Sequence, residues 1–337
     1  MLASLRSGLT PVVVGTHALL QPDVDFRDLA LSVIDEQHRF GVEQRLALTA
    51  KGRDADTLLM SATPIPRTLM MTAYGDLDVS RLTEKPAGRQ PVDTRAVPLD
   101  RIDEVIGGVS RALARGAKVF WVCPIVAESE TADLAAAEER HRVLGKLFPG
   151  RVGLVHGRMR SAEKDRAMAD FAAEQPGGVD LLVATTVIEV GIDVPAATIM
   201  VVEGAERFGL AQLHQLRGRI GRGDQASTCV LLYRAPLGEV ARQRLAILRD
   251  TEDGFRIAEE DLRLRGAGEV LGTRQSGLPS LRLADLAQHE ELVAIAHDDA
   301  RLILERDPEL SRPRGDALRV LLYLFQRDEA VQYLRAG

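Results

Sequence analysis

The chain has 337 residues, of which 45% are hydrophobic and 27% charged, a composition typical of a globular protein with room for two domains and an extension. No apolar run approaches the roughly 20 residues of a membrane span, and the amino terminus lacks the apolar centre of a signal peptide, which argues against membrane and secreted proteins. The net charge of −6 argues against a simple cationic nucleic-acid coat, and aromatic residues at 4% are too few for base stacking to dominate binding.

The first 90 residues contain three apolar runs that predict buried parallel strands. The runs are 11–15, 29–34 and 57–60, and each ends in polar residues. Ligands of open parallel sheets bind beyond the carboxyl ends of the strands, so we expect these polar residues to share one rim. A link rich in proline and glycine, 84–91, follows and predicts a domain boundary.

The next segment alternates strands and helices, which predicts a second parallel sheet with right-handed crossovers. The expected helices are 102–113, 134–148 and 161–174, the last capped by Ser161, and the expected strands are 119–124, 152–155, 180–184, 198–202 and 228–233. Cys123 and Cys229 lie in apolar runs, which predicts buried thiols in a reducing cytoplasm and not a disulfide or a metal pair.

From residue 236 onward the pattern is helical, with a glycine-rich loop at 266–277. The expected helices are 239–250, 255–265, 283–305 and 316–334. The predicted class is therefore α/β. Its domains are an incomplete first parallel-sheet domain at 1–90, a complete second one at 91–235 and a helical region at 236–337.

Two polar segments follow predicted strands of the first domain. Adjacent carboxylates at a strand exit, Asp35 and Glu36, can divide labour between holding a magnesium ion through water and activating an attacking water. The hydroxyls of Ser61 and Thr63 could bond His38 and relay the state of a bound nucleotide. The alternative for the second segment is a proline-rich turn that ends the strand.

Two further segments in the second domain can contact phosphates. Thr185 and Thr186 could donate to a DNA phosphate, and Asp193 could accept from a ribose hydroxyl. Taken alone, this stretch favours a helix amino terminus. Arg219 and Arg222 are three residues apart and would share the face of a helix, where two guanidinium groups suit a polyphosphate. An exposed basic helix is the alternative.

Taken together, these segments resemble the superfamily 2 nucleic-acid translocases in order and spacing. The order is Gly15 to His17, Asp35 to His38, Ser61 to Thr63, His156 to Gly157, Thr185 to Asp193 and Gln215 to Arg222. Within that superfamily the chain resembles the RecG family of branched-DNA helicases. The residues that carry this resemblance are Gly15 to Leu19, Asp35 to Val42, Ser61 to Thr68, Trp121 to Ile125, and the tail segments Asp261 to Gly268 and Gly272 to Gly277.

The resemblance implies RecA-like motor domains, the first incomplete and the second complete, followed by a helical translocation motif. It assigns ATP hydrolysis to Asp35, Glu36, Gln215, Arg219 and Arg222, with Asp35 also holding Mg²⁺ through water, and nucleotide binding to Gly191 and Asp193. The residues that would couple the nucleotide state to domain closure are His38, Ser61 and Thr63. DNA tracking falls to Gly15, Thr16, His17, Thr185 and Thr186, and duplex movement to Arg263, Arg265, Arg274 and Gln275. It further implies ATP and Mg²⁺ as cofactors, branched double-stranded DNA as substrate, a single-stranded DNA-binding protein as a further partner, and a cytoplasmic monomer.

One expected segment does not occur in the 337 residues, namely a glycine-rich loop ending in Gly-Lys-Ser/Thr that would cradle the phosphates of ATP. The chain is therefore expected to be the carboxyl-terminal part of a RecG-type helicase, without the wedge domain and inactive as an ATPase by itself. In related motors a phosphate-loop strand is expected between the strands that carry Asp35 and Ser61, so the first domain should be the less stable one.

Two other functions compete with this interpretation. A transcription-repair coupling translocase shares the tail motif and would have RNA polymerase as a partner. A DNA-binding or regulatory module without catalysis is favoured by the missing phosphate loop and disfavoured by the intact set of Glu36, Arg219 and Arg222.

Overall fold

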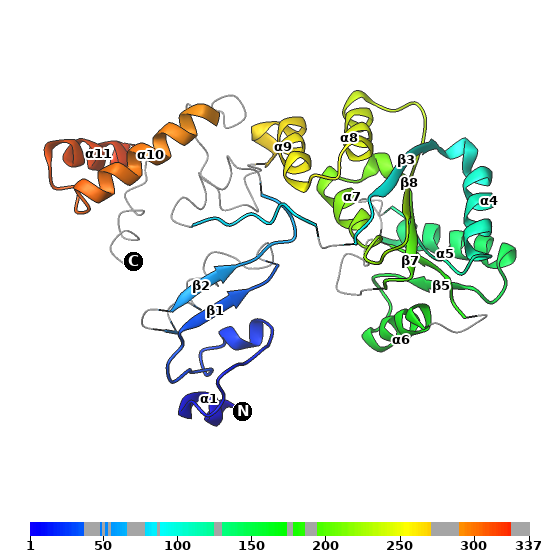
Figure 1. Ribbon diagram of the computed structural model, residues 1–337, viewed down its shortest axis with the longest axis horizontal. Coiled ribbons are helices and arrows are strands. Elements are labelled where there is room, and N and C mark those ends of the chain that lie inside the picture. The colour runs from blue at the N-terminus through cyan, green and yellow to red at the C-terminus, as the bar shows by residue number, and fades with distance from the viewer. Residues whose placement is uncertain are drawn as a thin grey trace. The chain divides into compact units, whose positions relative to one another are not determined.

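The computed structural model describes residues 1–36, 48, 51–52, 55–65, 78–85, 88–124, 130–173, 178–185, 194–270 and 290–324. The chain divides into two compact units, one made mainly of Met1–Pro64 and a second that begins at Ile65. Figure 1 gives the labels of their helices and strands.

The described residues of the first unit include a small parallel sheet and two short helical segments. Its elements in chain order are α1 (Leu2–Ser7), η1 (His17–Leu20), β1 (Leu31–Ile34) and β2 (Asp56–Leu59). β1 and β2 pair directly in parallel, with Ile34 opposite Leu59. Lys51 donates to two backbone carbonyls, those of Gln21 (2.8 Å) and Val24 (2.7 Å), and thereby holds the segment that precedes β1.

One strand prediction for this unit is wrong. Residues 11–15 do not form a strand, and Val12 and Val14 are 77% and 90% exposed. An apolar run becomes a strand only where a neighbouring strand offers its hydrogen bonds, and none of the described residues pairs with this one. The strands that precede Asp35 and Ser61 are direct neighbours here, because β1 pairs with β2 itself.

The second unit contains a six-stranded sheet in the order β3-β8-β7-β4-β6-β5, all strands parallel. The strands are β3 (Val92–Pro98), β4 (Lys118–Val122), β5 (Val152–Val155), β6 (Leu181–Ala184), β7 (Ala197–Glu203) and β8 (Ser227–Tyr233). The prediction of a parallel α/β sheet is confirmed. β3 was not predicted, because Asp93, Arg95 and Pro98 interrupt its apolar residues.

Helices cover both faces of this sheet (Figure 1). One face packs against α4 (Ile102–Leu113) and α5 (Glu130–Leu147), whose Leu113 and Leu144 are buried beside Trp121. The other face packs against α6 (Ser161–Ala172), α7 (Leu210–Arg217), α8 (Glu239–Asp250) and the start of α9 (Gly254–Val270). This double coverage explains why β4 and β6 are buried along their whole length.

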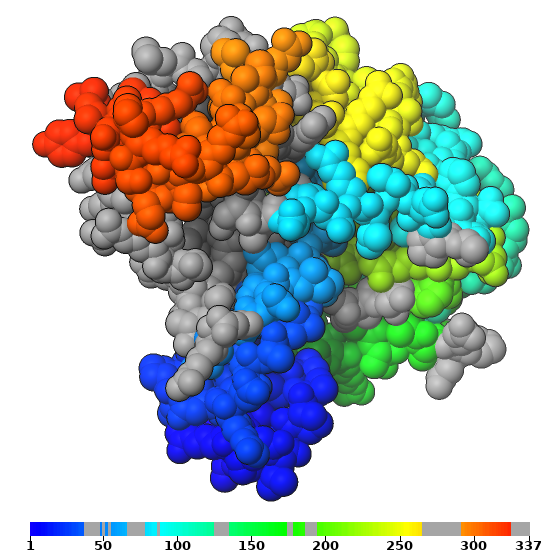
Figure 2. Space-filling model, turned by 60° about the vertical axis from the view of Figure 1, so that its left-hand side comes forward, coloured from blue at the N-terminus to red at the C-terminus, as the bar shows by residue number. Residues whose placement is uncertain are grey.

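The amino terminus of one helix differs from expectation. α6 begins at Ser161 itself, so Ser161 is not its cap, and the Glu163 carboxylate accepts instead from the N–H of Arg160 at 2.9 Å. The last described helices are α10 (Glu290–Arg306) and α11 (Pro313–Leu324), whose surface (orange to red) is visible in Figure 2. Asp307 stabilises the corner between them by accepting from the N–H groups of Ser311 (2.8 Å) and Arg312 (2.9 Å).

Candidate functional site

The carboxyl edge of the small sheet carries the first group of predicted site residues. Asp35 follows β1 and Ser61 lies two residues after β2, and the Met60 N–H donates to the Ile34 carbonyl at 2.8 Å. The two strands end in register, so the two polar segments begin at the same edge. The predicted common rim is therefore confirmed for these two segments, although not for residues 11–15.

The acidic pair has an unusual backbone. Glu36 adopts φ +53°, a left-handed conformation that costs a residue with a side chain about 1–3 kcal/mol. The Glu36 N–H donates to Asp35 Oδ1 at 2.8 Å, which fixes one oxygen of that carboxylate. Strained non-glycine residues cluster at functional sites, which supports the assignment of this turn to the site.

The hydroxyl groups near this edge are bonded locally. Ser61 Oγ lies 3.2 Å from Thr63 Oγ1 and accepts from the Thr63 N–H at 3.2 Å. Thr16 Oγ1 accepts from the Ala18 N–H at 3.5 Å and so begins the short helix at His17. His38, the proposed partner of Ser61 and Thr63, lies outside the described residues.

The second unit presents Thr185 at the carboxyl end of β6. Thr185 is 5% exposed, and its N–H donates to the Val155 carbonyl at 3.2 Å, which continues the sheet by one residue. Of the other residues predicted near it, Thr186, Gly191 and Asp193 lie outside the part of the chain that the structure describes.

The basic segment is a helix followed by a turn, and not a continuous helix. α7 ends at Arg217, so Arg219 and Arg222 lie in the turn beyond it, and the expectation that they share a helical face is wrong. Gly221 has φ +69°, and a Cβ there would lie 3.0 Å from Val92 Cγ2. The glycine thus lets the turn pass over the amino ends of β3 and β8. Exposed Arg222 donates from Nε to the Gly218 carbonyl at 3.3 Å.

The third arginine of this segment, Arg217, has a structural role that the sequence did not reveal. It is 3% exposed and donates to the carbonyls of Leu248 (2.5 Å) and Thr251 (3.0 Å) at the end of α8. Burial lowers the pKa of its guanidinium from the ordinary value. Arg217 therefore anchors α7, the helix that carries Gln215, to the corner between α8 and α9. The only sequence signal for this structural role is the position of Arg217 in the last turn of α7.

His214 shares this buried environment. Its Nδ1 lies 3.2 Å from Arg217 Nη2 and must accept, because a guanidinium only donates. Burial, followed by the positive charge of Arg217, lowers the pKa of His214 to about 4. His214 is consequently neutral at physiological pH and maintains the packing of α7.

A second polar network lies where β7 leaves the sheet. Glu203 accepts from both Arg140 Nη2 (2.7 Å) and Nε (2.8 Å), and from Trp121 Nε1 at 3.0 Å. The next residue, Gly204, has φ +63°, and a Cβ there would come within 2.9 Å of Pro124 Cγ. The exits of β4 and β7 are thus fixed together ahead of α7.

The predicted thiols are buried and free, as expected. Burial raises the pKa of Cys123 and of Cys229 to about 12, so both are unreactive thiols in the core. In the tail, Arg263 of α9 pairs with Glu260 at 2.8 Å on an exposed surface. Arg265, Arg274 and Gln275 have side chains outside the described residues.

The parallel α/β fold of the second unit is that of a helicase-type domain. Residues 100–224 match the model of the helicase conserved C-terminal domain. A solved structure of Mss116p bound to single-stranded RNA and AMP-PNP has a TM-score of 0.50 at 17% identity, and at that identity it supports the fold alone.

The chain belongs to the RecG family. Residues 251–331 match the model of the C-terminal part of domain 3 of ATP-dependent DNA helicase RecG. ATP-dependent DNA helicase RecG of Pasteurella multocida is 51% identical over 316 residues, and that of Acidithiobacillus ferridurans is 53% identical over 307 residues. A solved structure of RecG bound to a three-way DNA junction has a TM-score of 0.65 at 48% identity and covers 86% of this chain.

The chain spans less than half the length of these relatives. The match to the Pasteurella protein covers 92% of this chain and 45% of that protein. The match to the Acidithiobacillus protein covers 91% of this chain and 44% of that protein. The match to the solved RecG structure covers 37% of the RecG chain. Within the described residues, every helix is too short or too polar to cross a membrane.

Proposed function

We propose that this chain supplies part of an ATP-dependent motor that moves branched double-stranded DNA, such as stalled forks and Holliday junctions. The observation that carries the proposal is the basic turn after α7, held by buried Arg217, in a chain about half identical to RecG helicases. In this proposal 1–90 belongs to the first RecA-like lobe, 91–235 is the second lobe, and 236–337 transmits lobe closure to the duplex.

The proposed roles follow the chemistry of each side chain. Arg219 and Arg222 contact the γ-phosphate together with Gln215 and stabilise the charge that develops during transfer. Glu36 activates the hydrolytic water. Thr185 contributes to DNA tracking at the carboxyl end of β6, where it is 5% exposed.

The described residues fit ATP and Mg²⁺ only in part. Mg²⁺ keeps several waters and takes one or two carboxylates besides phosphate oxygens, which suits Asp35 as a ligand through water. The described residues contain no group of three metal-binding side chains. When bound, Mg²⁺ and ATP would supply the phosphoryl group and its charge neutralisation.

The 337 residues by themselves should not hydrolyse ATP, because they contain no Gly-Lys-Ser/Thr phosphate loop. The measurement is phosphate release by the purified chain with and without forked DNA. DNA-stimulated turnover that disappears in Glu36→Gln would refute this expectation.

A chimera tests the motor assignment directly. This chain would replace the 315 matched residues of Escherichia coli RecG, to which it is 51% identical. The chimera should unwind a forked duplex with ATP, and Arg222→Ala should lower kcat by roughly a thousandfold, as expected for removal of an arginine finger. Arg256→Ala, an exposed arginine on α9, serves as the matched control.

A second function, DNA binding without catalysis, is favoured by the missing phosphate loop alone. If this second function is correct, the chimera will bind forked DNA with the steep salt dependence of phosphate contacts but will not hydrolyse ATP. An active chimera that loses activity with Arg222→Ala would exclude it.

A further inference from the structure

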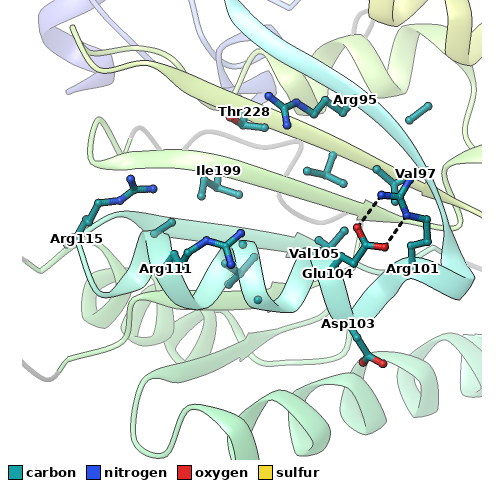
Figure 3. Close-up of a pocket in the computed structure, with 16 residues that line it drawn as sticks. Arg95, Val97, Arg101, Asp103, Glu104, Val105, Arg111, Arg115, Ile199 and Thr228 are labelled. Atoms are coloured by element: carbon teal, nitrogen blue, oxygen red, sulfur yellow. Dashed lines mark hydrogen bonds and ion pairs between the residues drawn. The ribbon is translucent and has the colours of Figure 1, made fainter.

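A groove of about 900 Å³ lies in the second unit between α4 and the adjacent part of the sheet (Figure 3). Its floor consists of side chains of β3, β8 and β7, namely Val97, Val230, Thr228 and Ile199. These strand residues are only half-buried, whereas Cys229, Leu231 and Met200 on the other face are fully buried. α4 therefore leaves an apolar strip of the sheet uncovered.

The groove is lined by four arginines and two carboxylates, and one of the carboxylates, Glu104, is paired with Arg101 at 2.6 Å. Arg111 and Arg115 extend from α4 and Arg95 from β3, and Figure 3 shows the three guanidinium groups around the floor. Arg95 has an exposed ion pair with Asp93 (2.6 Å), which is worth little in water. Arg111 and Arg115 are exposed, and no carboxylate of the described residues pairs with either of them. A chain with a net charge of −6 thus concentrates positive charge at one apolar strip.

The helix wall is built for an open groove. Gly107 and Gly108 occupy consecutive positions inside α4, where each glycine costs about 1 kcal/mol relative to alanine. The Arg111 guanidinium lies over them, since its Nη1 would be 3.6 Å from a Cβ at Gly107. Because glycine has no side chain, these two positions leave space in the groove beside the Arg111 guanidinium.

We infer that the groove binds an acidic peptide segment of a partner protein, whose apolar side chains rest on the floor while its carboxylates pair with Arg111 and Arg115. Nucleic acid fits less well, because none of the lining residues is aromatic, so the groove offers no platform on which a base could stack. This inference does not depend on the proposed motor function.

The test is binding of a fluorescein-labelled octapeptide of alternating aspartate and leucine to the 337-residue chain at an ionic strength of about 0.15 M, where long-range attraction is screened. The chain should bind it, and a peptide with serine in place of leucine should bind at least tenfold more weakly. The double variant Arg111→Glu/Arg115→Glu should also bind at least tenfold more weakly. Arg111→Gln/Arg115→Gln should show a smaller loss.

A matched control is Arg160→Glu/Arg166→Glu, which changes the net charge equally but lies at α6, on the opposite face of the sheet. It should bind within twofold of the parent chain, and thermal unfolding verifies that all variants fold. No binding by the parent chain, an equal loss in the control, or equal binding of the serine peptide would each overturn the proposal. Displacement of the peptide by forked DNA, with an equal loss of DNA binding in the Arg111/Arg115 variants, would make the groove a nucleic-acid surface instead.

Discussion

β1 and β6 are both apolar four-residue parallel strands, yet their burial differs. All four residues of β6 have no exposed surface. In β1, Ser32 and Ile34 are buried whereas Leu31 and Val33 are 55% and 52% exposed. β6 lies between β4 and β5 and is covered by helices on both faces, while β1 has β2 as its neighbour among the described residues.

The difference teaches that an apolar run does not determine its own burial. Each strand of a parallel sheet needs neighbours on both edges and a layer of helices on both faces to remove it from water. The four central strands of the larger sheet have both, and the stability of this sheet should therefore be cooperative. The smaller sheet should open in a local step that leaves the larger one intact.

Hydrogen exchange gives the largest expected contrast. Amides of β6 should exchange at least about a thousandfold more slowly than those of β1, because they require opening of the whole six-stranded unit. Mass spectrometry of peptides that cover 31–34 and 181–184 measures this. Equal protection would break the comparison and show that the small sheet is as cooperative as the large one.

Truncation of one leucine in each sheet should separate them next. Leu182→Ala should lower the free energy of unfolding by roughly 2–5 kcal/mol, since its side chain is fully buried. Leu58→Ala, at a residue that is 50% exposed, should cost less than about 1 kcal/mol. Urea unfolding followed by circular dichroism measures both, and equal costs would indicate that the exposed face of β2 is covered in solution.

Acid should weaken the large unit selectively. The folded pKa of His214, about 4, lies below its unfolded value of 6.5, so the unfolded chain binds the extra proton first. The stabilisation is complete above pH 6.5 and falls as the pH drops towards 4, by roughly 2–3 kcal/mol.

The matched variant is His214→Asn, whose amide oxygen can replace Nδ1 as the acceptor from Arg217. Thermal unfolding of the six-stranded unit between pH 7 and 4 should depend less on pH in this variant. An unchanged pH dependence would remove His214 as its cause.

The smallest effect is expected within the small sheet. Ser32 Oγ lies 2.9 Å from Thr57 Oγ1 on the paired strand, and Ser32 is 5% exposed. Ser32→Ala should lower stability by about 1 kcal/mol through the loss of this hydrogen bond. Ser110→Ala, on the exposed side of α4, should change stability by less than about 0.5 kcal/mol. Similar values for both would show that the hydroxyl pair does not hold β1 to β2.

The strands of the large sheet could be predicted because β4 and β6–β8 are nearly uninterrupted apolar runs. β3 could not, since its residues alternate with charges, and it becomes a strand because β8 offers a full edge from Val92–Ser227 to Pro98–Tyr233. The run at 11–14 is more apolar than β3 but pairs with no described strand. In both segments, strand formation depends on whether a pairing strand from a distant part of the sequence is present.

The candidate site was predictable in part for the same reason. Strand exits placed Asp35, Ser61 and Thr185 correctly, because a strand end is a local feature. The sequence alone could not distinguish the buried, structural Arg217 from Arg219 and Arg222, which lie in the turn beyond α7. Their difference depends on where α7 ends and on the α8 carbonyls that Arg217 meets, which lie 31 and 34 residues further along the chain.

The Glu203 network has an optical consequence. Trp121 is the single tryptophan of the chain, fully buried, with the Arg140 guanidinium 5.5 Å from its ring and the Glu203 carboxylate on its indole N–H. Its fluorescence therefore comes from one place, the exits of β4 and β7, and opening of the small sheet should leave the emission spectrum unchanged. Any ligand that alters the charges beside the indole should shift its emission, so Trp121 is an intrinsic fluorescent probe of this part of the sheet.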